Sequence, residues 1–244
     1  MEKTKGSNIF QVVLVALLVG AAFYIGSLSS KVDKLEKDAV VGADNQAPSQ
    51  PTAVVFDPNA IASTIGIDMD AFESCMQGGD APQRVQQETQ GGSQAGVSGT
   101  PGIILFDSRS GMSVVIPGAV DLATMQTFLD NLIAGKNPVF NQSEFELTKI
   151  EELPPLTDAD FIKGDRSARV TLFEYSDYDC PFCTKVHPTI QQLLDNNPGV
   201  ISWVYRQFPL DMHPEAFTKS VAAVCAGTVG GNDAFWAYSD ALLK

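Results

Sequence analysis

Two cysteines three positions apart form the clearest chemical motif of this sequence. Cys180 and Cys183 enclose Pro181 and Phe182 in the segment Cys-Pro-Phe-Cys. Two thiols at this spacing can close into a disulfide and open again, so the pair can exchange disulfides with other thiols. The spacing alone is a moderate indication, and its weight depends on the elements that hold the motif.

The motif lies between a predicted strand and a predicted helix. Residues 170–175, Val-Thr-Leu-Phe-Glu-Tyr, are β-branched and aromatic in the main, which favours a buried strand. After the motif, apolar residues recur with helical spacing at Val186, Ile190, Leu193 and Leu194. Pro181 suits the first turn of that helix, because the amide hydrogen that proline lacks would have no partner there. A second strand is predicted at residues 201–208.

This position has a chemical consequence. The reactive form of cysteine is the thiolate, and the N-terminus of a helix stabilises negative charge. We therefore expect Cys180 to be the more exposed sulfur, with a lowered pKa, and to be the one that attacks or is attacked. Cys183 is expected to be the buried resolving sulfur. Asp177 and Asp179 stand close to Cys180, and their charge would oppose a lowered thiol pKa.

The other candidate ligands do not favour a metal site. Structural zinc usually takes four ligands in two clustered pairs, and only one cysteine pair is clustered here. The two histidines of the chain, His187 and His213, are interpreted as packing or capping residues. We predict no metal and no dissociable cofactor. The alternative is a metal-binding or chaperone module that holds a soft ion such as Cu(I) through Cys180 and Cys183.

Composition limits the class of partner. The 244 residues allow one or two domains, and 44% hydrophobic against 18% charged residues suits a chain that buries a core. The formal net charge of -13 argues against nucleic acid as a partner, because no basic patch could offset the repulsion by phosphates.

An apolar run near the start predicts a membrane anchor. Residues 9–28 carry no charge and follow Lys3 and Lys5, which favours a cytoplasmic N-terminus. No convincing signal-peptidase site follows the run, so we expect the anchor to stay uncleaved and to contact lipid. The predicted segments are a cytoplasmic N-terminus at 1–8, one transmembrane helix at 9–30, and a stem and flexible linker at 31–58.

Residues 155–244 resemble the N-terminal half of a DsbA-like thioredoxin domain. The segments that carry the resemblance are GDRSARVTLFEYSDYDCPFCTKVHPTIQQLL, ISWVYRQFPLDMHPEA and FWAYSDALLK. In that family the cysteine motif opens the first long helix, and a helical insertion follows the second strand. The resemblance also implies that Glu174 matches a family acid that would relay the proton of Cys183. The alternative for Glu174 is a carboxylate in solvent at a strand end.

Residues 59–136 supply the elements of the other half of the same domain. Helical sequence comes first, and strands at 103–106 and 112–116 form a predicted hairpin. An amphipathic helix is predicted at 122–133.

The loop before the hairpin, Gly-Val-Ser-Gly-Thr-Pro-Gly, resembles the loop that carries a cis-proline facing the cysteines in thioredoxin-fold oxidoreductases. The matching residues are Thr100 and Pro101. The resemblance implies that Thr100 presents its backbone to a bound substrate beside Cys180. The expected substrate-binding residues are Thr100, Pro101, Pro181 and Phe182.

The halves stand in permuted order. Residues 59–136 form the C-terminal half, 137–154 a linker, and 155–244 the N-terminal half. The predicted fold is therefore α/β and thioredoxin-like, with a helical insertion, circularly permuted, and preceded by one transmembrane helix. The alternative is two incomplete domains that await partners in a second chain.

Cys75 and Cys225 fall on helices of the predicted insertion. Free thiols are unusual in an oxidising compartment, so one interpretation is a structural disulfide between them. The other is a pair of buried free cysteines that act as small apolar residues.

The predicted function is disulfide exchange with client proteins through Cys180 and Cys183, most simply as an oxidase on the outer side of the cell membrane, periplasmic or extracellular. Electrons would pass to a membrane redox partner or to another thiol protein. A reductase or isomerase of the same fold remains an alternative, because the dipeptide Pro-Phe does not decide the direction.

Overall fold

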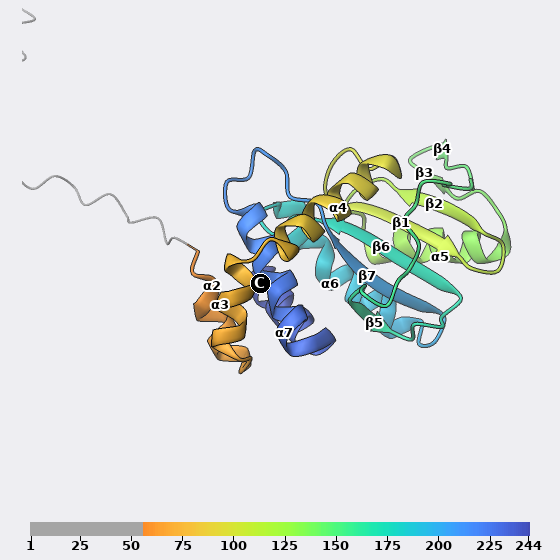
Figure 1. Ribbon diagram of the computed structural model, residues 1–244. Helices are drawn as coiled ribbons and strands as arrows, with labels where there is room; N and C mark the ends of the chain where they lie inside the picture. The colour runs from red at the N-terminus through yellow and green to blue at the C-terminus, as the bar shows by residue number, and fades with distance from the viewer. Residues whose placement is uncertain (1–55) are drawn as a thin grey trace, which may run out of the picture. The chain divides into compact units, whose positions relative to one another are not determined.

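The computed structural model describes residues 56–244, which form one compact unit (Figure 1). The predicted anchor at 9–30 and most of the predicted stem lie outside the described residues. No helix within residues 56–244 has both the length and the apolar character needed to cross a bilayer.

The described helices are α2 (Pro58–Ile65), α3 (Met69–Gln77), α4 (Asp80–Gln94), α5 (Leu122–Ala134), α6 (Pro181–Asn196) and α7 (Ala216–Leu242). The strands are β1 (Gly102–Asp107), β2 (Met112–Ile116), β3 (Val139–Phe140), β4 (Ser143–Glu144), β5 (Ile162–Gly164), β6 (Val170–Ser176) and β7 (Ile201–Gln207).

Strand β6 lies at the centre of a five-stranded sheet. The strand order is β2-β1-β6-β7-β5, with β6 parallel to β7 and antiparallel to β1. Every residue of β6 and β7 is buried, as the β-branched and aromatic sequence predicted. Because β1 belongs to the first half of the chain and β6 to the second, both halves build one sheet.

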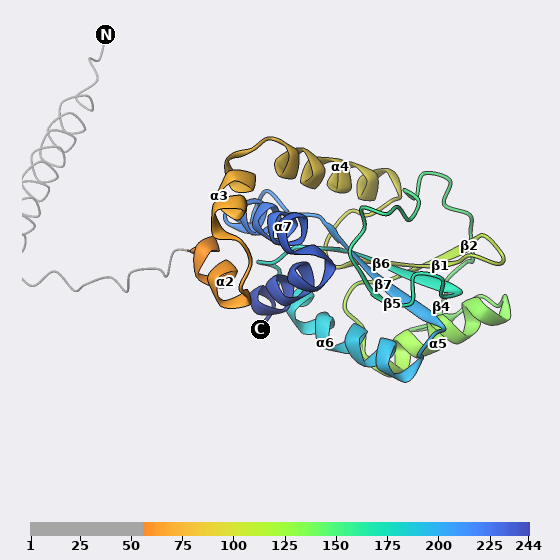
Figure 2. The ribbon, with the colours of Figure 1, turned by 60° about the horizontal axis from the view of Figure 1, so that its bottom comes forward.

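The sheet has two covered faces. Alternate side chains of β1 point to opposite sides: Ile103 and Leu105 join the core formed with α5, α6 and α7, whereas Ile104 joins a smaller cluster on the other face. Figure 2 shows α5 and α6 on one side of the sheet and α4 on the other. Residues 150–156 complete the smaller cluster with Ile150, Leu153 and Leu156.

Helices α2, α3 and α4 pack against α7 and form the helical insertion. Helix α7 is interrupted at Gly231, whose backbone is non-helical with a φ of 79°. Cys75 of α3 and Cys225 of α7 are joined by a disulfide, with Cα atoms 5.7 Å apart.

Several elements differ from the sequence-based expectation. The predicted linker at 137–154 contains the β3–β4 hairpin, and Thr148 pairs with Ser113 of β2. Strand β5 was not predicted. Helix α4 contributes to the core, because its Ala81 and Val85 are buried. Helix α6 contains Pro188 and continues through it without a break.

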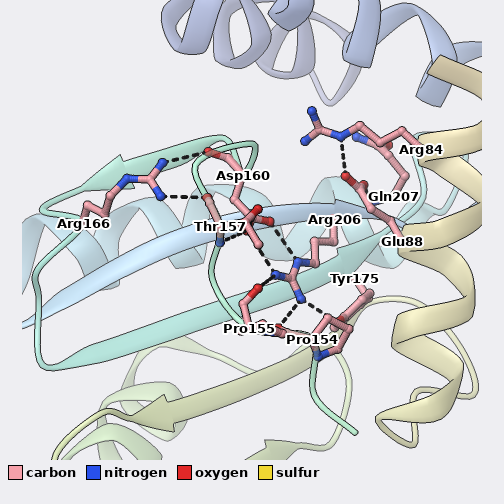
Figure 3. Close-up of polar contacts among 10 residues, drawn as sticks. All are labelled: Arg84, Glu88, Pro154, Pro155, Thr157, Asp160, Arg166, Tyr175, Arg206 and Gln207. Carbon is pink, nitrogen blue, oxygen red and sulfur yellow. Dashed lines mark hydrogen bonds and ion pairs between the residues drawn. The ribbon is translucent and has the colours of Figure 1, made fainter. Parts of the chain in front are cut away.

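Arg206 of β7 fixes the end of the linker to the sheet (Figure 3). Its guanidinium, almost fully buried, donates to both carboxylate oxygens of Asp160 at 3.1 and 3.2 Å. It also donates to the carbonyls of Pro154 and Pro155 at 2.8 and 2.9 Å, and to the hydroxyl of Tyr175 at 3.1 Å. A buried charge needs such pairing, and this one holds residues 154–160 in place.

Candidate active site

The cysteine motif begins helix α6. Cys180 is the N-cap residue with an extended backbone, and Pro181 occupies the first helical position. The amides of Cys183 and Thr184 donate to the carbonyl of Cys180 at 3.0 and 3.2 Å. The predicted strand-to-helix junction is confirmed, and it places the Cys180 sulfur beside the positive end of the helix.

Both motif cysteines are free thiols and both are buried. Cys183 is fully buried, as expected, but Cys180 is only 4% exposed. Cys180 is therefore the more exposed of the two sulfurs, as expected, although both are buried; the neighbouring Phe182, at 61%, is the exposed member of the motif. The low exposure of Cys180 has a visible cause, which is the loop that lies across it.

That loop contains Thr100 and Pro101, and the peptide bond between them is cis. The Cys180 sulfur lies 3.5 Å from the carbonyl oxygen of Thr100, although 80 positions separate the two residues. The same loop lines a pocket of about 320 Å³ that extends to residues 115–118 at the end of β2. The structure thus brings together Thr100, Pro101 and Cys180, which the sequence analysis had grouped by resemblance.

Glu174 is fully buried on β6. Its carboxylate accepts hydrogen bonds from the Ser176 hydroxyl at 2.8 Å and from Trp203 Nε1 at 3.0 Å. Burial raises the pKa of Glu174, against the opposing influence of the His187 charge and of these two hydrogen bonds. The solvent-exposed alternative for this carboxylate is therefore wrong.

The Cys183 thiol lies in the same buried region. Burial raises its pKa well above the ordinary value for cysteine, and the charge of Glu174 raises it further. Cys183 thus holds its proton firmly and needs a nearby acceptor before its sulfur can act as a nucleophile.

The two acids beside Cys180 are each paired. Asp177 is fully buried and lies 2.7 Å from His213 Nδ1, and it also accepts from the amide of Leu210 at 2.8 Å. Asp179 forms an ion pair with Lys219 and accepts from the amide of Glu215 at 3.2 Å. The expected opposition of these acids to a thiolate is weaker than the sequence suggested, because residues 210–219 supply compensating groups.

His187 is buried on the same face of α6 as Cys183 and serves as a packed residue. Its Nε2 lies 2.8 Å from Asp240 Oδ1, and its ring packs against Trp203 at a centroid distance of 4.7 Å. Lys163 also binds Asp240, at 3.0 Å. Sequence reasoning did not identify Ser176, Trp203, Lys163 or Asp240 as neighbours of the buried acid.

Comparison with known families agrees with this geometry. Residues 44–130 match the family model described as DSBA-like thioredoxin domain, and residues 156–244 match the model described as Thioredoxin. Both parts of the chain thus match models of the thioredoxin superfamily, and one of the two models is DsbA-like. The two matches do not test the predicted circular permutation, which stays a prediction.

The curated relatives of the chain include much longer proteins. The chain is 33% identical over 148 residues to Na(+)/H(+) antiporter NhaA 1 of Salinispora arenicola, a match that covers 58% of this chain and 22% of that protein. It is 39% identical over 92 residues to Na(+)/H(+) antiporter NhaA 3 of Salinispora tropica, which covers 37% and 14%. The chain thus spans less than a quarter of these curated relatives.

A solved DsbA-like structure matches part of the chain. The crystal structure of Pseudomonas aeruginosa DsbA2 is 38% identical to it over 36% of this chain and 48% of that chain, with a TM-score of 0.34.

Within residues 56–244, no group of three or more histidine, cysteine or acidic side chains is arranged to hold a metal ion.

Proposed function

We propose that this protein is a thiol–disulfide oxidoreductase that exchanges disulfides with client proteins through Cys180 and Cys183, acts mainly as an oxidase, and is held outside the cytoplasm by an N-terminal membrane anchor. The single observation that carries the catalytic part is the 3.5 Å approach of the Cys180 sulfur to the Thr100 carbonyl at the start of a helix. A reactive sulfur, a helix N-terminus and a backbone acceptor converge there.

The exchange proceeds through a mixed disulfide. A client thiolate attacks Cys180 in the Cys180–Cys183 disulfide, and Cys183 leaves as a thiolate that takes up a proton. A second client thiolate then attacks the client sulfur of the mixed disulfide, so that the client gains a disulfide and the protein becomes a dithiol. The reverse sequence reduces a client disulfide.

Two features support oxidation as the main direction. The N-terminus of α6 favours the thiolate at Cys180, and stabilisation of the reduced form makes a dithiol pair a stronger oxidant. Lys219 also pairs with Asp179 next to the motif, and His213 hydrogen-bonds Asp177. Reductase or isomerase activity remains the second candidate, and the measured reduction potential separates it from oxidation.

Clients would approach over the exposed apolar side chains near the motif. Phe182 is 61% exposed, and Met212 and Phe217, at 79% and 41%, belong to the segment that contacts Asp177 and Asp179. Apolar groups on such a surface suit binding of unfolded chains. We assign Thr100, Pro101, Pro181 and Phe182 to client binding, and a membrane or thiol redox partner to the reoxidation of the dithiol.

The catalytic proposal is tested by exchange assays on the purified protein. We expect the protein to oxidise a reduced model protein. Its reduction potential should lie well above that of a reducing thioredoxin, which is about -270 mV. Cys180→Ser should abolish exchange, whereas the Cys75→Ala/Cys225→Ala protein should keep it, because that disulfide is remote from the motif. An inactive wild type, or an active Cys180→Ser variant, would refute the proposal.

The location is tested separately. The apolar run at residues 9–28 after Lys3 and Lys5 supports an anchor with the remainder of the chain outside. Alkaline phosphatase fused after Lys244 should be active, and green fluorescent protein fused at the same position through the general secretion route should stay dark. The opposite pattern, or recovery of the protein in the soluble fraction, would contradict the anchor.

A further inference from the structure

Ser176 occupies the space between the resolving thiol and the buried acid. It is the last residue of β6, two positions after Glu174, so both side chains leave the strand on the same side. Ser176, Glu174 and Cys183 are all fully buried. The Ser176 hydroxyl donates to Glu174 Oε1 at 2.8 Å, and it lies close enough to Cys183 to lower the pKa of that thiol.

The step in which Cys183 resolves the mixed disulfide requires a proton acceptor. Cys183 must lose its proton before its sulfur can attack, and burial together with the charge of Glu174 holds that proton on the sulfur. Glu174 has a raised pKa and can accept a proton near neutral pH more readily than an ordinary glutamate. A hydroxyl can accept one proton while it donates another, so Ser176 can join the two groups.

We propose that Ser176 relays the proton of Cys183 to Glu174 when the mixed disulfide at Cys180 is resolved, a role that rests on the proposed function. The Cys183 proton passes to Ser176 Oγ as the original hydroxyl proton passes to Glu174. The Cys183 thiolate attacks Cys180, the Cys180–Cys183 bond forms, and the client sulfur leaves as a thiolate. The protein dithiol is oxidised and the client disulfide is reduced by the same two electrons.

The other ionisable groups around Ser176 are accounted for. Tyr205 of β7 and Tyr178 before the motif stay neutral at physiological pH, because burial raises the pKa of each phenol. His187 of α6 and Lys163 of β5 act on Glu174 through their charge and are both held by Asp240 of α7. The other sulfur that faces this region is Cys180. Within residues 56–244, none of these groups hydrogen-bonds Glu174, whereas Ser176 does.

The relay can be isolated with 5,5′-dithiobis(2-nitrobenzoate) and the reduced full-length protein. Attack by Cys180 releases one coloured thiolate, and resolution by Cys183 releases a second, so one stopped-flow trace reports both steps. Loss of the first release in Cys180→Ser tests the proposed function. The relay concerns the second release alone.

We expect Ser176→Ala to slow the second release at least tenfold at pH 6–7, in line with the ~10²–10⁴-fold range of acid–base catalysis, and to leave the first within about twofold. Ser176→Thr keeps the hydroxyl and should recover most of the rate. Ser202→Ala is the matched control, since Ser202 is also fully buried, on the neighbouring β7; it should leave both releases unchanged.

The relay also predicts dependence between two residues. Glu174→Gln should slow the second release, and the Ser176→Ala/Glu174→Gln protein should be no slower than the slower single variant, because both act in one proton path. Equal slowing of both releases, no slowing, multiplication of the two single effects, or failure of a folded Ser176→Thr protein to recover the rate would each overturn the relay.

Discussion

At the scale of single residues, the proposed role of Glu174 in proton transfer conflicts with the stability of the folded protein. A carboxylate in a fully buried position forgoes hydration, and its hydrogen bonds to Ser176 and Trp203 do not restore its ordinary pKa. The same raised pKa makes it a suitable proton acceptor for Cys183. A residue kept for proton transfer is therefore expected to lower the free energy of unfolding at neutral pH.

This gives a prediction with a defined pH dependence. Burial raises the pKa of Glu174 in the folded protein above its ordinary value. Its protonation therefore stabilises the folded state fully below the unfolded-state pKa, and this stabilisation is lost as pH rises through the folded-state pKa. Glu174→Gln, which can still accept from Trp203 and hydrogen-bond Ser176, should raise the free energy of unfolding at pH 7 by on the order of 1 kcal/mol.

Urea unfolding of the wild type and Glu174→Gln at several pH values measures this. The two proteins should have equal stability near pH 4 and should diverge as pH rises. A difference that is constant across the range, or a variant that is less stable at pH 7, would mean that burial of the charge is not the dominant effect.

Asp179 gives a second prediction at this scale. Lys219 pairs with it next to Cys180, so Lys219→Met should leave an uncompensated negative charge beside the thiolate. Alkylation of Cys180 by iodoacetamide at pH 7 should slow by a factor of about 3–10, which corresponds to roughly 0.7–1.4 kcal/mol. The exposed Lys149 provides the control: Lys149→Met makes the same charge change in the linker and should not alter the rate. Equal effects of both variants would contradict the local pairing.

Sequence reasoning was sufficient for residues that carry a local signal. The cysteine spacing, the acid before it and the Thr-Pro segment are each visible within a few positions. Ser176 was missed although the two-residue alternation of a strand puts it on the side of Glu174. Lys219 was missed for a different reason: it lies 40 positions from Asp179, and no local pattern encodes the return of residues 210–219 to the motif.

At the scale of elements, the long periodic segments were predictable and the short ones were not. Strand β5 has three residues, which are too few to show an alternation of apolar and polar side chains. By pairing with β7 it covers backbone groups that would otherwise be unpaired at the edge of the sheet. The β3–β4 hairpin has two residues per strand and lies in a segment interpreted as linker. Strand β5 is defined by its pairing with β7, which is distant in the sequence.

The disulfide between α3 and α7 cross-links a helix of the first half to a helix of the second half. It closes a loop with a sequence separation of 150 residues, and such a long loop restricts the unfolded chain strongly. The Cys75→Ala/Cys225→Ala protein should lose about 2–5 kcal/mol of stability and should keep its exchange activity. Calorimetry together with the exchange assay checks both parts. A loss of activity at temperatures where the variant is folded would mean that this disulfide takes part in the reaction.

At the scale of the whole molecule, the two halves depend on each other. Strands β1 and β2 of the first half complete the sheet that β5, β6 and β7 begin. Glu88 of α4 accepts from the amide of Gln207 in β7 at 2.7 Å, which adds a polar link across the halves (Figure 3). Separated, each half would expose a strand edge and an apolar sheet face.

The sequence predicted that the two halves would pack together, because residues 59–136 supply the hairpin and residues 155–244 supply the two other predicted strands of the sheet. It could not predict how their junction is fixed. Arg206 is one of three polar residues in the mostly apolar strand β7, and its partners at residues 154–160 belong to a segment without periodicity. The single sheet agrees with the expected permuted domain, but the permutation itself and the rival account of two swapped, incomplete domains call for a direct test.

The last prediction separates these accounts by cutting the linker. Asn141 and Gln142 are exposed at the turn of the β3–β4 hairpin, so a protease site inserted between them can be cleaved in the folded protein. The protein used consists of residues 56–244, the compact unit, with Cys75→Ala/Cys225→Ala so that no disulfide holds the fragments. Before cleavage it should sediment as a monomer and unfold in one transition.

After cleavage the fragments should remain together, because the β1–β6 pairing and the buried core still join them. The cleaved protein consists of two chains, which separate when it unfolds. The midpoint of its unfolding transition should therefore fall and should depend on protein concentration. The complex should also keep a reactive Cys180, because Thr100 and Cys180 now lie on different fragments and meet only in the native arrangement. A dimer before cleavage would support swapped domains, and two independent transitions or fragments that separate at micromolar concentration would show that the halves do not form one domain.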